Sequence, residues 1–475
     1  MSGSTGFVPI TIVNVSEQIG PTPSVLQRTG ALVSQGATTL TPGTFSLLTQ
    51  LNSLTPLLKG VLTLTSLAFS TGTVTATAAA PHGFTIGDTL ILTIAGATPT
   101  GYNGTFLCTV TTTTAFTYAL ATNPGTETAP GTYTVEDVAE LTSMATTFFA
   151  QGGANSVYVL ELGPGNAIDG ITALTTFITA MPGFFYSYLL PHTWGVEPTF
   201  YTSFAKNFTS TTSKTYFHVT TTLAFWQANP TLFAATLKSV LVMIEAPTVA
   251  TAAAAGTPIE FSAASRFYVT LNQNPSPSNQ VTQLAFSFVF GVTPYPIMGN
   301  SSLFAQLKAA AIGIIGTGAE GGISNTILLY GQTLDGNDFN KFWYSVDFVQ
   351  INLDLNTSNA VINGSNNPQA PLNNNQQGIN SLQAVAVNTM QSAIADGLAL
   401  GTLVQTQMTG TAFAAAVAAG QFAGQVVVNA VPFANYNQLN PGNYQLGIYS
   451  GLSVAYTVQL GFSQIIYNVE VANFV

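Results

Sequence analysis

The sequence predicts a multidomain protein of mixed α/β (α+β) class, with an α/β core, an inserted all-β domain, a C-terminal α+β domain and extended β arms at both termini. Three observations support this class. Helical and β-type patterns alternate from about residue 135, a Thr-rich β segment interrupts the chain at 61–134, and two long amphipathic helical patterns lie in the last third. A chain of 475 residues is also long enough to form several domains.

Each chain end carries a short β-type run, at residues 7–15 and 463–475. Polar or Gly-containing segments join these runs to the rest of the chain. Side chains alternate along a strand, so every second residue shares a face. The residues expected on the shared faces are Val8, Ile10 and Ile12 in the first run, and Ile465, Tyr467, Val469 and Val471 in the last. We expect these faces to make contacts with other subunits, although pairing within the same chain is an equally simple use of two β-type ends.

Residues 61–134 change composition abruptly. Thr is frequent, Gly, Pro and Asn provide turn signals, and the only charged residues are Asp88 and Glu127. Short β-type runs between these turns predict a β-sandwich-like surface domain of five to seven strands, inserted into another domain.

Residues 135–245 alternate between helical and β-type patterns. Helical patterns cover 135–150, 168–180, 198–209 and 230–238, and β-type runs cover 156–162, 184–190, 215–222 and 239–245. This alternation predicts an α/β layer with a largely parallel sheet. Two loops are expected after it, the Ala-rich 248–258 and the polar 272–280.

The last third contains two amphipathic helical patterns, at 339–355 and 379–394. No Asp, Glu, Lys, Arg or His lies between Asp396 and Glu470, and this stretch contains β-type runs at 425–431 and 452–460 with a turn-rich segment at 435–443. The predicted division is a β arm at 1–20, an α/β body at 21–60 and 135–330, the inserted domain at 61–134, a C-terminal domain at 331–462 and a second arm at 463–475.

Charged residues are scarce: 8 Lys and Arg and 18 Asp and Glu make up only 5% of the chain, while 47% of residues are hydrophobic. Disordered chains are highly charged, so this composition excludes disorder. Eight cations cannot form a phosphate-binding groove, which argues against nucleic acid as a partner. The best spanning candidate, 408–430, is rich in Ala and Gly and is interrupted by Gln, so membrane insertion is not expected, and the N-terminus lacks the pattern of a secretory signal. We infer that the chain buries much of its surface against copies of itself.

No enzyme motif is recognisable. The three histidines, His82, His192 and His218, are isolated and expected to be structural, and the single Cys108 is expected to be a buried apolar residue rather than part of a disulfide or thiolate cluster. Four acidic residues could suggest a cation site, but their spacing fits no calcium loop and a solvated or interface face is the better interpretation. These residues are Asp335, Asp338, Asp347 and Asp354. No catalytic residue, cofactor or metal site is predicted.

One dinucleotide-like pattern is present, Gly316-Thr-Gly318-Ala-Glu-Gly321. Such a pattern requires a strand before it and a helix after it, because the helix N-terminus binds the pyrophosphate. Here the preceding residues 303–311 have a helical period and the following residues 323–330 are β-type. The pattern is therefore interpreted as a simple turn.

Five segments, in order, resemble the tail sheath proteins of contractile-tailed bacteriophages. They are 15–36 with Phe45 and Leu48, TFFAQGGANSVYV at 147–159, DGNDFNKFW at 335–343, 378–397, and PFANY with NPGNY at 432–444. Together they cover most of the chain outside the insertion. Within the insertion, PHGFTIGD at 81–88, ATPTGYNGTF at 97–106 and FTY at 116–118 resemble small β domains that recur on phage structural proteins, which implies decoration, adhesion or shielding.

The resemblance implies a structural virion protein, not an enzyme. Its residues 331–462 would form an assembly domain, and subunits would polymerise as homo-oligomers in stacked, hexameric rings around a tail tube, between baseplate and tail terminator proteins. Terminal arms would add strands to a neighbour's sheet, and contraction would drive the tube through the host envelope for genome ejection. The location implied is the phage tail, assembled in the host cytoplasm, without a nucleic-acid partner or membrane insertion.

Two other classes stay open at this point. The chain could be another tail or baseplate component, or a surface-lattice protein, although a lattice protein would require an export signal. A tail-associated glycan hydrolase would need paired carboxylates about 5 to 9.5 Å apart, which a sequence cannot test.

Overall fold

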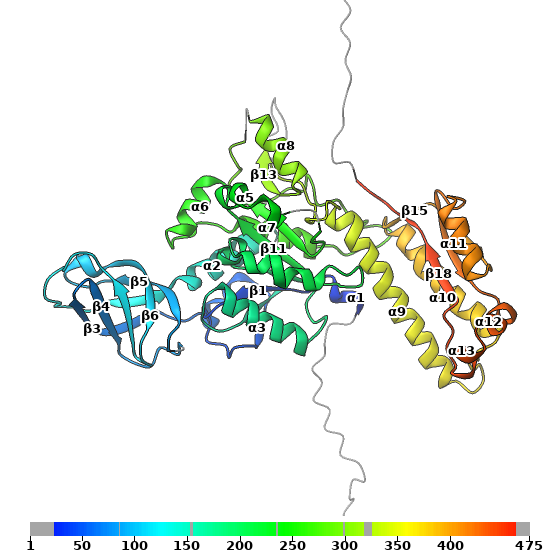
Figure 1. Ribbon diagram of the computed structural model, residues 1–475, viewed down its shortest axis with the longest axis horizontal. Helices are drawn as coiled ribbons and strands as arrows, with labels where there is room; N and C mark the ends of the chain where they lie inside the picture. Colours follow the sequence, from blue (N-terminus) through cyan, green and yellow to red (C-terminus); the bar gives the residue numbers. More distant parts are fainter. Residues whose placement is uncertain are drawn as a thin grey trace, which may run out of the picture.

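The computed structural model describes residues 23–461, apart from residue 85 and residues 153–154, 234–235, 298–299 and 318–324. It has three parts, seen side by side in Figure 1: a blue-to-cyan barrel, a central α/β body, and a yellow-to-red C-terminal part. The predicted mixed α/β class is confirmed. No helix in the described part of the chain has the length and apolar character that a membrane span requires.

The body is built on a six-stranded sheet in the order β12-β11-β10-β1-β9-β2. Its strands are β1 (Gly30–Ser34), β2 (Phe45–Leu48), β9 (Val157–Glu161), β10 (Ser187–Leu189), β11 (Tyr216–Thr221) and β12 (Val240–Ile244). All adjacent pairs are parallel except β2 with β9, as predicted for a largely parallel sheet. Strands β1, β10, β11 and β12 are buried along their whole length, because helices cover both faces.

Two hydrophobic cores lie on the two faces of this sheet. On one face pack α2 (Glu136–Ala150), α7 (Ser262–Leu271) and α9 (Tyr344–Ser365), and on the other α3 (Ala167–Ala180) and α8 (Ser301–Ala309). The C-terminal part packs against the body on the first of these faces, since Tyr344 and Val349 of α9 belong to the hydrophobic core on that face.

Several local predictions in the body were wrong. The Ala-rich 248–258 is largely a helix, α6 (Pro247–Ala254), because Ala favours helix and Pro is tolerated at a helix start. The helix predicted at 198–209 is a π turn followed by a 3-10 turn, η4 (Phe200–Phe204) and η5 (Ala205–Phe208). Among the described residues of the helix predicted at 230–238, η6 (Pro230–Phe233) is a 3-10 turn and 236–238 are not helical. The remaining short helices are α1 (Pro23–Leu26), η1 (Leu51–Ser53), η2 (Thr55–Leu57), α4 (His192–Gly195) and α5 (Leu223–Ala228).

The inserted segment forms a closed barrel, not a sandwich, in the order β3-β4-β7-β6-β5-β8. Its elements are β3 (Leu62–Ser70), β4 (Thr73–Ala78), β5 (Thr89–Ala95), η3 (Thr100–Tyr102), β6 (Gly104–Val110), β7 (Ala115–Ala119) and β8 (Thr132–Val135). The last strand pairs with both β3 and β5, and this double pairing closes the sheet. Cys108 is buried in β6, as predicted.

The residues around the dinucleotide-like pattern form an antiparallel hairpin of β13 (Ile314–Thr317) and β14 (Thr326–Leu329). The helical period predicted for 303–311 is confirmed by α8 (Ser301–Ala309), but the prediction missed β13, which lies after this helix and contains the first two residues of the pattern. The element that follows is a strand, as predicted, and antiparallel pairing differs from the strand-helix-strand unit of a dinucleotide site.

The C-terminal part begins with η7 (Phe339–Trp343) and α9, which packs against α10 (Gln376–Ala395). The later elements are β15 (Ala399–Leu400), β16 (Thr402–Thr406), α11 (Gly410–Ala418), β17 (Gln425–Ala430), α12 (Phe433–Leu439), α13 (Pro441–Gln445), β18 (Leu452–Ala455) and β19 (Thr457–Val458). The turn-rich prediction for 435–443 was wrong, because α12 and α13 are two short helices separated at Asn440, directly before Pro441.

Candidate assembly surface

A three-stranded sheet in the order β16-β17-β18, here called the C-terminal sheet, is the part of the structure that fits strand addition. β16 and β17 run parallel, with Thr402 opposite Gln425, and α11 lies between them in the chain. β18 runs antiparallel to β17, with Val427 opposite Ala455. Strands of mixed direction accept further strands of either direction, because each edge exposes N–H and C=O groups alternately.

The sheet is tied to α10 by one buried amide. Gln383 Nε2 donates to the carbonyl oxygens of Thr406 (2.9 Å) and Val428 (3.0 Å), so it links α10 to the ends of both β16 and β17. On β17, Asn429 Oδ1 accepts hydrogen bonds from the Thr406 hydroxyl (3.0 Å) and the Met408 N–H (2.7 Å). These bonds hold β16 in register before any partner strand arrives.

Both outer edges of the C-terminal sheet are open within the described residues. β16 and β18 pair on one side only, with β17, and both are partly exposed while five of the six residues of β17 are buried. The Thr402 N–H lies toward β17, since it contacts the Gly424 carbonyl at 3.4 Å. By alternation, the N–H groups of Leu403 and Gln405 point to the open side, where no described backbone group bonds them. Such an edge is a template for another strand.

The C-terminal sheet connects to the body through a buried carboxylate on α9. Asp347 Oδ2 accepts hydrogen bonds from the hydroxyls of Tyr216 (2.8 Å) and Tyr186 (3.0 Å). Burial raises the pKa of Asp347 to about 6, against the lowering effects of Lys238 and the two tyrosine hydroxyls. The Lys238 ammonium lies 4.2 Å from the centre of the Trp343 ring.

A second buried ionic group lies at the opposite end of the body. His192 Nδ1 is 2.5 Å from Glu140 Oε1, and its Nε2 is 3.0 Å from Glu245 Oε2. Burial lowers the pKa of His192, but the two carboxylates outweigh this effect and raise it to about 10. Glu245 also accepts the Ser262 N–H at the start of α7. Sequence reasoning treated His192 as structural and missed both glutamates, since they lie 52 and 53 residues away in the chain.

The crevice where parallel sheets bind ligands is filled by the protein itself. At the carboxyl ends of β1 and β9, Glu161 accepts hydrogen bonds from the N–H groups of Gly36, Thr38 and Gly163 at 2.7 to 3.1 Å. Beside it, Gln35 accepts a hydrogen bond from the Trp194 indole at 2.6 Å. Donors that would otherwise hold a phosphate are thus already used.

The predicted arm residues Val8, Ile10, Ile12, Ile465, Tyr467, Val469 and Val471 lie outside the described residues. Of the four aspartates, Asp347 is fully buried, which corrects the prediction of a solvated or interface face, while Asp335 accepts hydrogen bonds from Thr333, Asn337 and Trp343. Across the described ranges, no three His, Cys, Asp or Glu side chains gather as a metal site would require. His82 stacks on Phe84 at 4.7 Å, and His218 is buried beside Phe267.

Comparison with solved structures finds the same fold in chains from a contractile particle. The chain is similar to a subunit in the six-fold symmetrised baseplate of the anti-feeding prophage, at 12% identity and TM-score 0.53, covering 98% of this chain and 99% of that one. It is similar to a subunit of the contracted helical sheath of the same particle at 12% identity and TM-score 0.50, with the same coverage. A sheath tail protein from Listeria innocua matches at 9% identity and TM-score 0.38, covering 78% and 85%. No protein-family model matches the sequence, and the search of curated proteins found no match.

Proposed function

We propose that this chain is a structural subunit of a contractile tail sheath, which polymerises in stacked rings around a tail tube and contracts to drive the tube through the host envelope. The observation that supports the proposal is the similarity in fold to two subunits, one from an assembled sheath and one from an assembled baseplate. This similarity covers nearly the whole of both chains in each comparison. A role without catalysis agrees with the filled crevice at the carboxyl ends of β1 and β9.

The open edges of the C-terminal sheet would connect the subunits. The terminal segments that contain Val8, Ile10 and Ile12, and Ile465, Tyr467, Val469 and Val471, would each add a strand beside β16 or β18 of a neighbouring subunit. Strand addition would pair the backbone groups of Leu403 and Gln405, and it needs no charged side chains. This explains how a chain with only 5% charged residues can form a specific contact.

Contraction would require two packings of the same subunits with a barrier between them. The strand-added arms would keep the subunits connected while their bodies slide. Additional apolar contact in the contracted state, at about 25 cal/mol per Å², would provide the driving free energy without a nucleotide. The inserted barrel lies at one end of the subunit in Figure 1, where it could project from an assembly and serve decoration, adhesion or shielding.

Electron microscopy of the purified full-length protein tests the proposal. Striated tubes or stacked rings are expected, and deletion of residues 1–15 or 463–475 should leave a folded protein that forms neither. Flat sheets would indicate a surface lattice instead, and discrete particles with activity on glycans would indicate a hydrolase. Tubes formed by the truncated chains would contradict the role given to the arms.

A baseplate component is the second candidate, because one of the similar chains belongs to a baseplate. Such a subunit would form single six-fold rings that do not stack into tubes. The same images therefore distinguish the two candidates, since ring stacking is expected only of the sheath.

A further inference from the structure

Three phenylalanines form an exposed apolar surface on the body, here called the Phe surface. Phe286, Phe288 and Phe290 are 42%, 58% and 57% exposed, while Val289 between them is buried. Phe288 and Phe290 flank Val289 in a stretch that is bridged to β14, so their side chains share a side, and Phe286 precedes them in a turn with φ 66°. This concentration of large apolar side chains is unusual on a surface that water alone would cover.

Hydrogen bonds hold the Phe surface in place. The segment pairs with β14, since the Phe286 N–H donates to the Leu328 carbonyl at 2.8 Å and the Leu328 N–H donates to the Ser287 carbonyl at 3.0 Å. At its end, Gln151 binds the backbone of Phe290 twice, donating to the carbonyl at 2.6 Å and accepting from the N–H at 2.8 Å. The surface is therefore a preformed one, which lowers the entropic cost of binding.

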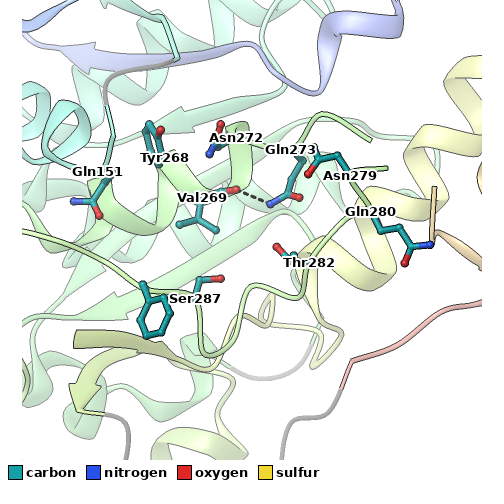
Figure 2. A pocket seen from close by; sticks show the side chains of 10 residues that line it. Gln151, Tyr268, Val269, Asn272, Gln273, Asn279, Gln280, Thr282 and Ser287 are labelled. Carbon is teal, nitrogen blue, oxygen red and sulfur yellow. Dashed lines mark hydrogen bonds between the residues drawn. The ribbon is translucent and has the colours of Figure 1, made fainter. Parts of the chain in front are cut away.

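A cavity of about 290 Å³ adjoins the Phe surface and is lined mainly by amide and hydroxyl side chains (Figure 2). Gln273, Asn279 and Gln280 each use the side-chain N–H group to bind a backbone carbonyl, that of Val269 or Asn274 in the body or that of Ala395 at the end of α10. Their side-chain carbonyl oxygens accept no hydrogen bond from the described residues. A row of neutral acceptors beside an apolar surface suits an extended peptide, whose backbone supplies N–H donors at regular spacing.

The last described residues of the chain lie close to this cavity. Gly461, the last described residue, lies against the Gln283 side chain so closely that a Cβ on Gly461 would overlap the amide. The Gln283 carbonyl in turn accepts a 3.1 Å hydrogen bond from the Ser287 hydroxyl, and Ser287 and Phe288 both line the cavity. The segment 462–475 therefore starts at a point in contact with Gln283, which is only a few residues from the Phe surface along the chain.

We propose that residues 462–475 of this chain dock on the Phe surface and the adjoining cavity of the same subunit before assembly. The apolar face of Ile465, Tyr467, Val469 and Val471 would supply large apolar side chains to cover the exposed rings of the Phe surface. At about 3.3 Å per residue, this segment reaches roughly 45 Å, well beyond the length of the Phe surface. Glu470 carries its only side-chain charge at neutral pH, so little side-chain charge would be buried on docking.

Docking in this way would keep the C-terminal arm from joining neighbouring subunits until a growing end offers a better partner. This consequence rests on the proposed function, but docking itself does not. The two can fail separately, because docking is measured on the dilute, unassembled protein and polymerisation by electron microscopy.

Hydrogen exchange on the dilute full-length protein tests the docking. We expect backbone amides of 463–471 to exchange roughly tenfold faster in the double variant Phe288→Ser, Phe290→Ser than in the parent. The matched control is Leu439→Ser, Leu446→Ser, which removes two equally exposed apolar side chains from α12 and its surroundings. Equal exchange of this segment in all three proteins would overturn the proposal.

Cross-linking identifies the occupant. A cysteine pair made by Thr282→Cys and Asn468→Cys should be joined by a short bismaleimide, whereas Thr112→Cys with Asn468→Cys should not. Burial raises the pKa of Cys108 to about 12, so this native thiol stays unreactive. In a mixture of ¹⁴N- and ¹⁵N-labelled protein, links within single-isotope chains support docking in the same subunit. Mixed-isotope links would show a second copy as the occupant and overturn the proposal, as would a yield no higher than in the control pair.

Discussion

The Tyr216 hydroxyl on β11 donates a 2.8 Å hydrogen bond to Asp347 Oδ2 on α9, across 131 residues of chain. A second tyrosine, Tyr186 directly before β10, donates to the same oxygen, so residues at the starts of two adjacent strands of the parallel sheet hold one carboxylate of the C-terminal part. This contact fastens α9, the first long helix of the C-terminal part, to the central sheet of the body. It also depends on pH, because burial raises the pKa of the Asp347 carboxyl to about 6.

Stability should fall as pH rises from 4 to 6 because of Asp347. Burial raises the pKa of this carboxyl from 3.8 to about 6, so the folded state retains a proton that the unfolded state releases. The contribution is fully present below pH 4 and is lost as pH rises through 6, a change of about 3 kcal/mol at 1.36 kcal/mol per pKa unit. Asp347→Asn keeps an acceptor for the tyrosines but cannot ionise. Urea unfolding gives the free energy of unfolding of the parent and of Asp347→Asn. The difference between the two proteins should change by this amount between pH 4 and pH 7, and a difference that does not depend on pH would contradict the assignment.

Replacing His192 should destabilise the body. Glu245 would be left as a buried carboxylate, and Glu140 as a partly buried one, without their shared cation, which costs about 3 to 5 kcal/mol. We therefore expect His192→Gln to lower the midpoint of urea unfolding at pH 7. Because the two carboxylates raise the pKa of His192 to about 10, the stabilisation is fully present below pH 6.5 and is lost as pH rises through 10. The parent should therefore be no more stable than the variant at about pH 10 or above. A difference in stability that stays constant with pH would exclude a charged His192.

Gln383→Ala should weaken the C-terminal sheet. The variant leaves the carbonyls of Thr406 and Val428 without this donor, and each unsatisfied buried group costs about 1 to 3 kcal/mol. Hydrogen exchange should become faster in β16 and β17, while β11 in the body stays protected. Gln421→Ala, which changes an exposed amide, is the control and should leave both regions unchanged. Slow exchange in β16 of the first variant would mean that Gln383 does not hold this edge.

Gln405→Pro should block assembly without unfolding the subunit. Its N–H points to the open side of β16, so a proline there removes a donor that a partner strand needs but none that β17 uses. Gln405→Thr keeps the N–H and serves as the control. Circular dichroism should be the same for both, and sedimentation should show polymers only for the control. Polymers of normal length from the proline variant would rule out strand addition at this edge.

Local sequence patterns predicted the elements whose periodicity is strong. The helical spacing before Ala150 is α2, the β-type run after Asn155 is β9, and the long pattern after Phe339 becomes α9 after one π turn. The central strand β1 was missed, because five buried residues, Gly30–Ser34, show no alternation. Its position is marked only by packing, since a Cβ on Gly30 would come within 2.6 Å of both Phe267 and Leu271.

The sequence by itself determined the alternation of helices and strands, the scarcity of charge and the β character of the insertion, because these depend on neighbouring residues and composition. Only the tertiary structure decided the strand order of the sheet, the closure of the barrel by β8, the partners of Asp347 and the position of Gly461 against Gln283. Each of these joins residues far apart in the chain. Such contacts follow from how whole elements pack, and the period of one segment carries no information about which other segment it will meet.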